Sequence, residues 1–185
     1  MSGDVTMTCQ SRLMPESLRI DYEIVNHTDR GVYVYVLPTD SAMEPHHQQT
    51  YAALSANQRI LYLVLDRSPI GQEQGHNDRN VVPLACYLKP AAQYQDRFVV
   101  YLPVREWHAY AVPQQSNYSS SVEVEHAVLS VAYLFEDDTE QVARSKVPGF
   151  HEVTGSLSQK LVITLKLPTP ITVEKLIDGG ERMTF

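Results

Sequence analysis

The sequence predicts an all-β protein, a two-sheet antiparallel β-sandwich of about seven or eight strands. Three observations favour this fold class. Apolar residues alternate with polar ones along several segments, irregular stretches rich in proline, glycine and polar residues separate these segments, and no convincing amphipathic helix is present. Because the side chains of a strand alternate between its two faces, such a pattern predicts strands with one buried face. The 185 residues suit a single domain (1–185), with its core expected over about 17–177.

The clearest alternation lies in 18–37. Its first half places one apolar set on the same side of an extended chain, namely Leu18, Ile20, Tyr22 and Ile24. After a turn at 26–31, the alternation resumes with Val32, Val34 and Val36. We interpret the two halves as a β-hairpin with one buried face. Tyr33 and Tyr35 fall on the opposite side, where either a second layer covers them or they form an exposed aromatic stripe.

Further strands follow in order. The apolar run at 59–66 indicates a strand that is covered on both faces. The segment 81–88 is predicted to lie at a sheet edge or a bulge, since Pro83 cannot donate a hydrogen bond to a neighbouring strand. After a turn at 89–95, the next strand has an alternating inward set, Phe98, Val100 and Leu102.

The longest strand is predicted at 121–135. Its apolar alternation changes phase partway, which is explained either by a bulge near 126–128 or by a bend that carries the strand from one sheet to the other. Two strands at 161–167 and 171–177 close the chain, and two prolines between them are expected to end the first. A single helical turn is expected at 52–58 or 140–145.

Antiparallel strands also predict where the loops lie. If successive strands alternate in direction, their connections alternate between the two ends of the sandwich. One end would then hold the loops at 26–31, 68–80 and 103–120. The other end would hold those at 38–58, 89–95 and 136–156.

Composition disfavours several classes of protein. The net charge is −7 and the basic residues are scattered, whereas nucleic-acid phosphates require clustered Lys and Arg. No apolar run approaches the roughly 18 residues of a membrane-spanning helix. Residues 1–6 have neither the basic nor the apolar part of a signal peptide, so a cytoplasmic protein is expected. The alternative is an exported domain whose signal has been removed.

The sequence also contains two cysteines and two short triplets of the N-glycosylation type. The spacing of Cys9 and Cys86 matches no zinc or thioredoxin motif, and we expect free, buried thiols rather than a disulfide. The triplets that begin at Asn26 and Asn117 match the N-glycosylation pattern, which often arises by chance.

The sequence contains no complete catalytic or metal-binding motif. It has no G-x-S-x-G elbow, no glycine-rich phosphate loop and no H-E-x-x-H pattern. His46, His47 and His151 with Glu152 do not form a complete set of metal ligands by their spacing. We therefore expect no enzymatic activity, no metal and no other cofactor. A metal-binding or enzymatic sandwich that uses these histidines is the least favoured alternative.

The candidate binding residues are aromatic residues in loops or on an outer face. The long segment 103–120 combines its aromatic side chains with amides and can therefore offer stacking surfaces and hydrogen bonds. Its candidates are Trp107, His108, Tyr110 and Tyr118. Such a loop suits a protein or a sugar, although Trp107 could instead plug the open end of the core. Tyr33 and Tyr35 would form another binding surface if nothing covers them.

The segment 19–36 has the order strand, Asn-x-Thr turn, strand. It resembles the first part of bacterial immunoglobulin-like domains over about a tenth of the chain. The resemblance implies an immunoglobulin-like sandwich of bacterial origin and assigns no functional residue. We interpret the chain as a non-catalytic module that binds another protein, a second copy of itself included. A carbohydrate-binding module that uses the Trp107 loop is the alternative.

Overall fold

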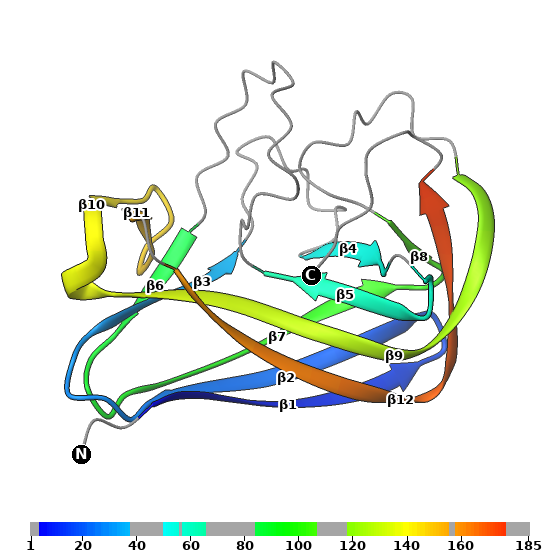
Figure 1. Cartoon of the computed structure of the whole chain (residues 1–185), viewed down its shortest axis with the longest axis horizontal. Helices are drawn as coiled ribbons and strands as arrows, with labels where there is room; N and C mark the ends of the chain where they lie inside the picture. Colours follow the sequence, from blue (N-terminus) through cyan, green and yellow to red (C-terminus); the bar gives the residue numbers. More distant parts are fainter. Residues whose placement is uncertain are drawn as a thin grey trace.

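The computed structural model describes residues 4–37, 50–55, 57–65, 84–106, 118–155 and 158–176. In these ranges the chain forms twelve strands and one short 3₁₀ helix, η1 (Glu136–Asp138) (Figure 1). The strands are β1 (Val5–Met14), β2 (Ser17–Asn26), β3 (Val32–Leu37), β4 (Tyr51–Leu54), β5 (Ile60–Val64), β6 (Leu84–Leu88), β7 (Gln93–Tyr101), β8 (Val104–Arg105), β9 (Tyr118–Phe135), β10 (Thr139–Arg144), β11 (His151–Gly155) and β12 (Gln159–Leu176). The predicted all-β class is confirmed.

The strands form two sheets. The smaller sheet has the order β1-β2-β7 and is antiparallel. The larger sheet has the order β10-β11-β6-β3-β9-β12-β8, with β5 beside β9 and β4 beside β5. Two of its pairs, β5–β9 and β8–β12, are parallel. The prediction of seven or eight purely antiparallel strands is therefore wrong in number and in direction, because short strands and crossovers leave little signal in the sequence.

One apolar core contains buried side chains from both sheets. Most of the residues that the alternation places in the core are buried, namely Leu18, Ile20, Ile24, Val34, Leu63, Val100, Val131 and Leu165. Two others, Leu102 and Ile163, are only half-buried. Ile163 lies on a part of β12 that pairs with β9 on one side. Among the described strands, none pairs with this part on the other side, because β8 pairs with β12 only at Val173 and Glu174.

The predicted hairpin of β2 and β3 does not form. β2 pairs with β1 and β7, whereas β3 pairs with β6 and β9. The turn between them therefore carries the chain from one sheet to the other. The predicted faces are correct, because an alternating pattern selects the buried face of a strand whichever strand lies beside it.

Asn26 holds this crossing turn. Its side chain is fully buried. Its Nδ2 donates hydrogen bonds to the carbonyl oxygens of Arg30 (2.7 Å), Leu88 (3.3 Å) and Lys89 (3.2 Å). Its Oδ1 accepts from the Thr28 backbone N–H (3.0 Å) and from the Thr28 hydroxyl (2.6 Å). The triplet that begins at Asn26 is therefore a structural element, since its amide is committed to the fold; Asn117 lies outside the described residues.

A second crossing turn lies beside the first. The turn between β6 and β7 also joins the two sheets, and its Ala91 N–H donates to the carbonyl oxygen of Asn26 (2.9 Å). The loop prediction placed these two turns at opposite ends, which is wrong. β6 and β9 are both antiparallel to β3, and β5 is parallel to β9, so β5 and β6 run in the same direction. Successive strands therefore do not alternate throughout the chain.

Other elements also differ from the prediction. Strands β4 and β10 occupy the two segments where a helical turn was expected, and β1 was not predicted. β6 lies between β3 and β11 rather than at an edge, while its pairing with β3 is irregular between Tyr35 and Leu37, as the alternative of a bulge allows; Pro83 itself lies outside the described residues. β9 has 18 residues, a length that β12 equals, and its inward side changes phase between Val124 and Ala127, as expected. At this point the partner strand β12, and not β9, contains the additional residues of the irregularity. β12 continues through both prolines, and its pairing with β9 is irregular between Lys166 and Ile171.

Both cysteines are free, as expected, but only Cys86 is buried, whereas Cys9 is half-buried. Burial is the main cause that raises the pKa of the Cys9 thiol to about 11 and that of the Cys86 thiol to about 12. Because the thiolate is the reactive form, both thiols should react slowly with Ellman's reagent at pH 8. In concentrated guanidinium chloride both should react at once. Rapid modification of both thiols in the folded protein would contradict the raised pKa values and the burial of Cys86.

Candidate functional site

The two tyrosines predicted on the outer side of β3 differ in burial. Tyr35 is buried in a small apolar cluster with residues of β6, β9 and β11, namely Ala85, Ala132, Leu134 and Val153. Its hydroxyl donates to the carbonyl oxygen of Val153 (3.2 Å). A covered position is therefore correct for Tyr35, which does not belong to an exposed stripe.

Tyr33 remains half-buried and joins two other aromatic rings. Its ring centroid lies 5.0 Å from that of Tyr87, its register partner on β6. The centroid of His151, from β11, lies 5.7 Å away with the rings edge to face. Tyr87 and His151 are also half-buried. We name these three side chains, which come from three adjacent strands of the larger sheet, the Tyr33 cluster.

Glu136 borders the Tyr33 cluster. Its Oε2 accepts a hydrogen bond from the Tyr87 hydroxyl (2.5 Å), and its Oε1 accepts one from the Gly31 backbone N–H (3.1 Å). The first bond is the main cause that raises the pKa of Tyr87 to about 12 and lowers the pKa of Glu136. At neutral pH a neutral phenol therefore donates to a carboxylate, which orients both groups. Burial, followed by the charge of Glu136, raises the pKa of Tyr33.

Gly31 allows this close approach. A Cβ atom at this position would lie 2.6 Å from Cε2 of Tyr87, closer than carbon atoms normally come. The backbone of the crossing turn therefore packs directly against the Tyr33 cluster. Beside it, the Arg30 guanidinium lies 3.6 Å from the centroid of the Phe135 ring and 3.8 Å from a carboxylate oxygen of Asp137.

Tyr118 lies far from the Tyr33 cluster. It begins β9, whereas Tyr33 pairs with Leu134, sixteen residues along the same strand. At about 3.3 Å per residue, the separation along β9 is about 50 Å. The Tyr118 ring has the Arg105 guanidinium 5.3 Å from its centroid. The predicted site residues Tyr118 and Tyr33 therefore cannot belong to one binding site.

The remaining predicted site residues, Trp107, His108 and Tyr110, lie outside the described residues, as do His46 and His47. Within the described ranges, no group of three or more His, Cys, Asp or Glu side chains could hold a metal ion. No helix in this part of the chain has the length and apolar character needed to span a bilayer.

Sequence reasoning missed Tyr87 and Glu136 as site residues and considered His151 only as a metal ligand. The position of Tyr87 could have been anticipated, since it alternates with Cys86 and Leu88 and so points outward. Its position beside Tyr33 depends on the pairing of β3 with β6, which carries no signal in the sequence. Neither a family model, nor a curated protein, nor a solved structure matches this chain.

Proposed function

We propose that the protein is a non-catalytic, immunoglobulin-like module that binds another protein through the Tyr33 cluster. The observation that carries the proposal is the three half-buried rings on adjacent strands, next to the exposed carboxylate of Glu136. Tyrosine is enriched where proteins meet, because it offers a large contact area and a hydrogen-bonding group. The immunoglobulin-like assignment rests on the segment 19–36, and two sheets around one core are compatible with it.

The support beneath the Tyr33 cluster favours tight binding. Tyr33 packs against the buried cluster that contains Tyr35, Leu134 and Val153. Glu136 fixes the Tyr87 hydroxyl, and Gly31 holds Glu136 through its backbone. A surface that is already ordered loses little conformational entropy when a partner binds.

The ionisation of these groups supports a binding role rather than catalysis. A general acid or base works best when its pKa lies near the pH of the reaction. The pKa of Tyr87 is raised to about 12, and that of Glu136 is lowered from its ordinary value. Both shifts move the group away from neutral pH, so each keeps its ordinary charge state there.

Replacing both Tyr33 and Tyr87 by Ala should weaken the complex with a captured partner by about 2 kcal/mol or more. The immobilised chain is used to capture partners from the native host, and the dissociation constant is then measured with the purified partner. Sedimentation of the purified chain tests whether the partner is a second copy.

Val162→Ala is the control, because Val162 is 61% exposed and lies on β12, outside the three strands of the Tyr33 cluster. It should leave the affinity unchanged. If the double variant keeps its fold and binds every captured partner as the wild type does, the Tyr33 cluster is not the interface.

A further inference from the structure

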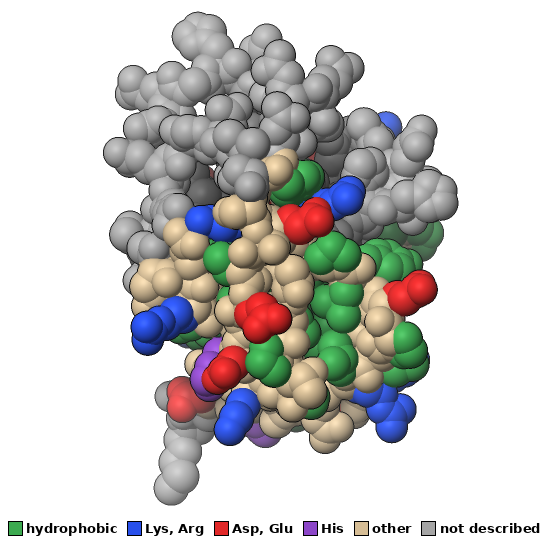
Figure 2. Space-filling view, turned by 90° about the vertical axis from the view of Figure 1, so that its right-hand side faces the viewer, with side chains coloured by type: hydrophobic (Ala, Val, Ile, Leu, Met, Phe, Trp, Pro, Cys, Tyr) green, Lys and Arg blue, Asp and Glu red, His purple; other side chains and the backbone are tan. Residues whose placement is uncertain are grey.

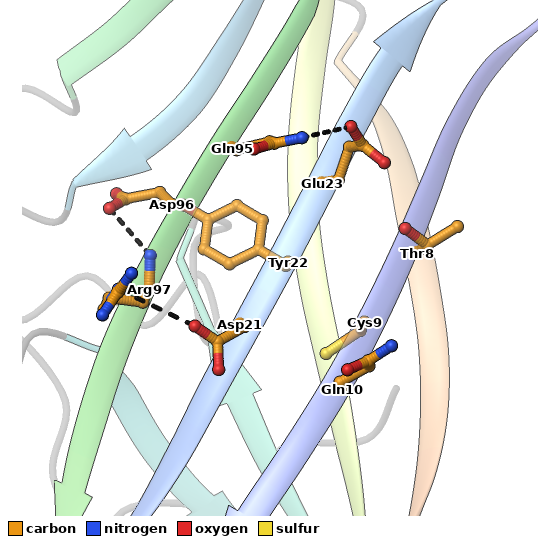
Figure 3. A pocket seen from close by; sticks show the side chains of 9 residues that line it. All are labelled: Thr8, Cys9, Gln10, Asp21, Tyr22, Glu23, Gln95, Asp96 and Arg97. Atoms are coloured by element: carbon orange, nitrogen blue, oxygen red, sulfur yellow. Dashed lines mark hydrogen bonds and ion pairs between the residues drawn. The ribbon is translucent and has the colours of Figure 1, made fainter.

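The outer face of the smaller sheet carries a polar depression of about 470 Å³ (Figure 3). Two neighbouring rows of outward side chains cross β1, β2 and β7 there. The first row is Thr8, Glu23 and Gln95, and the second is Gln10, Asp21 and Arg97. These residues alternate along their strands with side chains that face the core, so the depression and the core lie on opposite sides of this sheet.

Hydrogen bonds and ion pairs hold these side chains in place. The amide of Gln95 donates to a carboxylate oxygen of Glu23 (2.6 Å). Arg19, from the row beyond, donates two hydrogen bonds to Asp21 (2.8 and 2.6 Å). The guanidinium of Arg97 lies 3.7 Å from the same carboxylate. The depression therefore presents planar groups with fixed donors and acceptors before any ligand arrives.

The charges in and beside the depression cancel. The carboxylates of Asp21, Glu23 and Asp96 are balanced by the guanidinium groups of Arg97 and, in the row beyond, of Arg12 and Arg19. Such a balanced set of charges attracts neither a cation nor an anion strongly. A neutral ligand with many hydroxyl groups, in contrast, can form hydrogen bonds with both the donors and the acceptors. A protein partner is less suited, because the centre of a protein interface is depleted of charged residues.

An exposed aromatic ring lies on the same face, beyond the depression. Tyr101 follows Arg97 by four residues on β7 and is 60% exposed. Met14, which is 45% exposed, lies in the same row across Ser17. Figure 2 shows hydrophobic side chains among charged ones at the side of the molecule where β1 and β7 end. From Gln95 to Tyr101 the strand extends about 20 Å, enough for several sugar rings.

We propose that this face binds a neutral oligosaccharide that lies along β7, with one sugar ring stacked on Tyr101 and the hydroxyl groups of others in the depression. A sugar ring has an apolar C–H face and a polar rim. Tyr101 supplies an apolar surface, and Asp21, Glu23, Gln95 and Arg97 supply hydrogen bonds. The site is separate from the Tyr33 cluster on the larger sheet.

The full chain is tested on an array of neutral, sialylated and sulfated glycans, and the best neutral oligosaccharide is then titrated by calorimetry. Tyr101→Ala and Asp21→Ala should each weaken its binding about tenfold or more. Tyr101→Phe keeps the ring and should bind within about threefold of the wild type. The Tyr33→Ala variant should bind the sugar as the wild type does.

The proposal is overturned if no neutral glycan binds, or if Tyr101→Ala and Asp21→Ala both bind as the wild type does. Binding that requires sialic acid or sulfate would mean that Arg12 and Arg19 attract an anionic glycan. That result would also overturn the proposal of a neutral ligand. A Tyr101→Ala variant that loses both its fold and its binding is replaced by Tyr101→Leu. Retained sugar binding by a folded Tyr101→Leu variant would then contradict the stacking. None of these outcomes depends on protein binding by the Tyr33 cluster.

Discussion

Asn26→Asp should lower the free energy of unfolding by about 3 kcal/mol or more. The side-chain amide of Asn26 donates to three backbone carbonyls, those of Arg30, Leu88 and Lys89. A carboxylate of the same size cannot donate to them, and it places a negative charge beside their oxygen atoms in a buried position. Both crossing turns should therefore lose the side-chain hydrogen bonds that hold them, while their backbone hydrogen bonds remain.

The matched control is Asn57→Asp, in the turn between β4 and β5. Asn57 is exposed, and its Oδ1 accepts hydrogen bonds from the Ser55 hydroxyl (2.6 Å) and the Arg59 backbone N–H (3.2 Å). A carboxylate can accept the same bonds, so the change should stay within about 0.5 kcal/mol. Both variants are unfolded in urea under the same conditions. Equal midpoints for Asn26→Asp and the wild type would show that the fold does not depend on these three hydrogen bonds.

Leu129→Ala should destabilise the protein by about 2–5 kcal/mol, since the truncated side chain leaves a cavity in the core. Leu129 is fully buried on β9, with Leu63 of β5 on one side and Ile163 of β12 on the other. The alternation alone would give Ile163→Ala a similar cost. Because Ile163 is only half-buried, we expect its truncation to cost less than that of Leu129.

Val162→Ala is the control for this pair. Val162 adjoins Ile163 on β12 but is 61% exposed, so its truncation should change stability by less than about 0.5 kcal/mol. Denaturant unfolding of the three variants should rank the losses as Leu129, then Ile163, then Val162. A loss at Val162 as large as that at Leu129 would contradict the assigned faces of β9 and β12.

The Tyr33 cluster shows how much of a site can be predicted from such a sequence. Tyr33 was predicted to point away from the core, because it alternates with three buried valines. The companions of Tyr33 come from distant segments: Tyr87 follows it by 54 positions, Glu136 by 103 and His151 by 118. Only the pairing of β3 with β6, and of β6 with β11, brings the three rings together. The Glu136 carboxylate is positioned by the end of β9, because Glu136 is the first residue of η1, which follows β9 directly.

The sequence by itself determined the fold class and the buried face of most long strands. This information is local, since burial selects one of two faces and the two-residue period shows which one. The tertiary structure decided which strands pair, and it replaced the expected hairpin of β2 and β3 by a crossing between the sheets. Strands with similar alternation are interchangeable as local patterns. The choice among them depends on contacts between distant residues, such as those that Asn26 makes with Leu88 and Lys89.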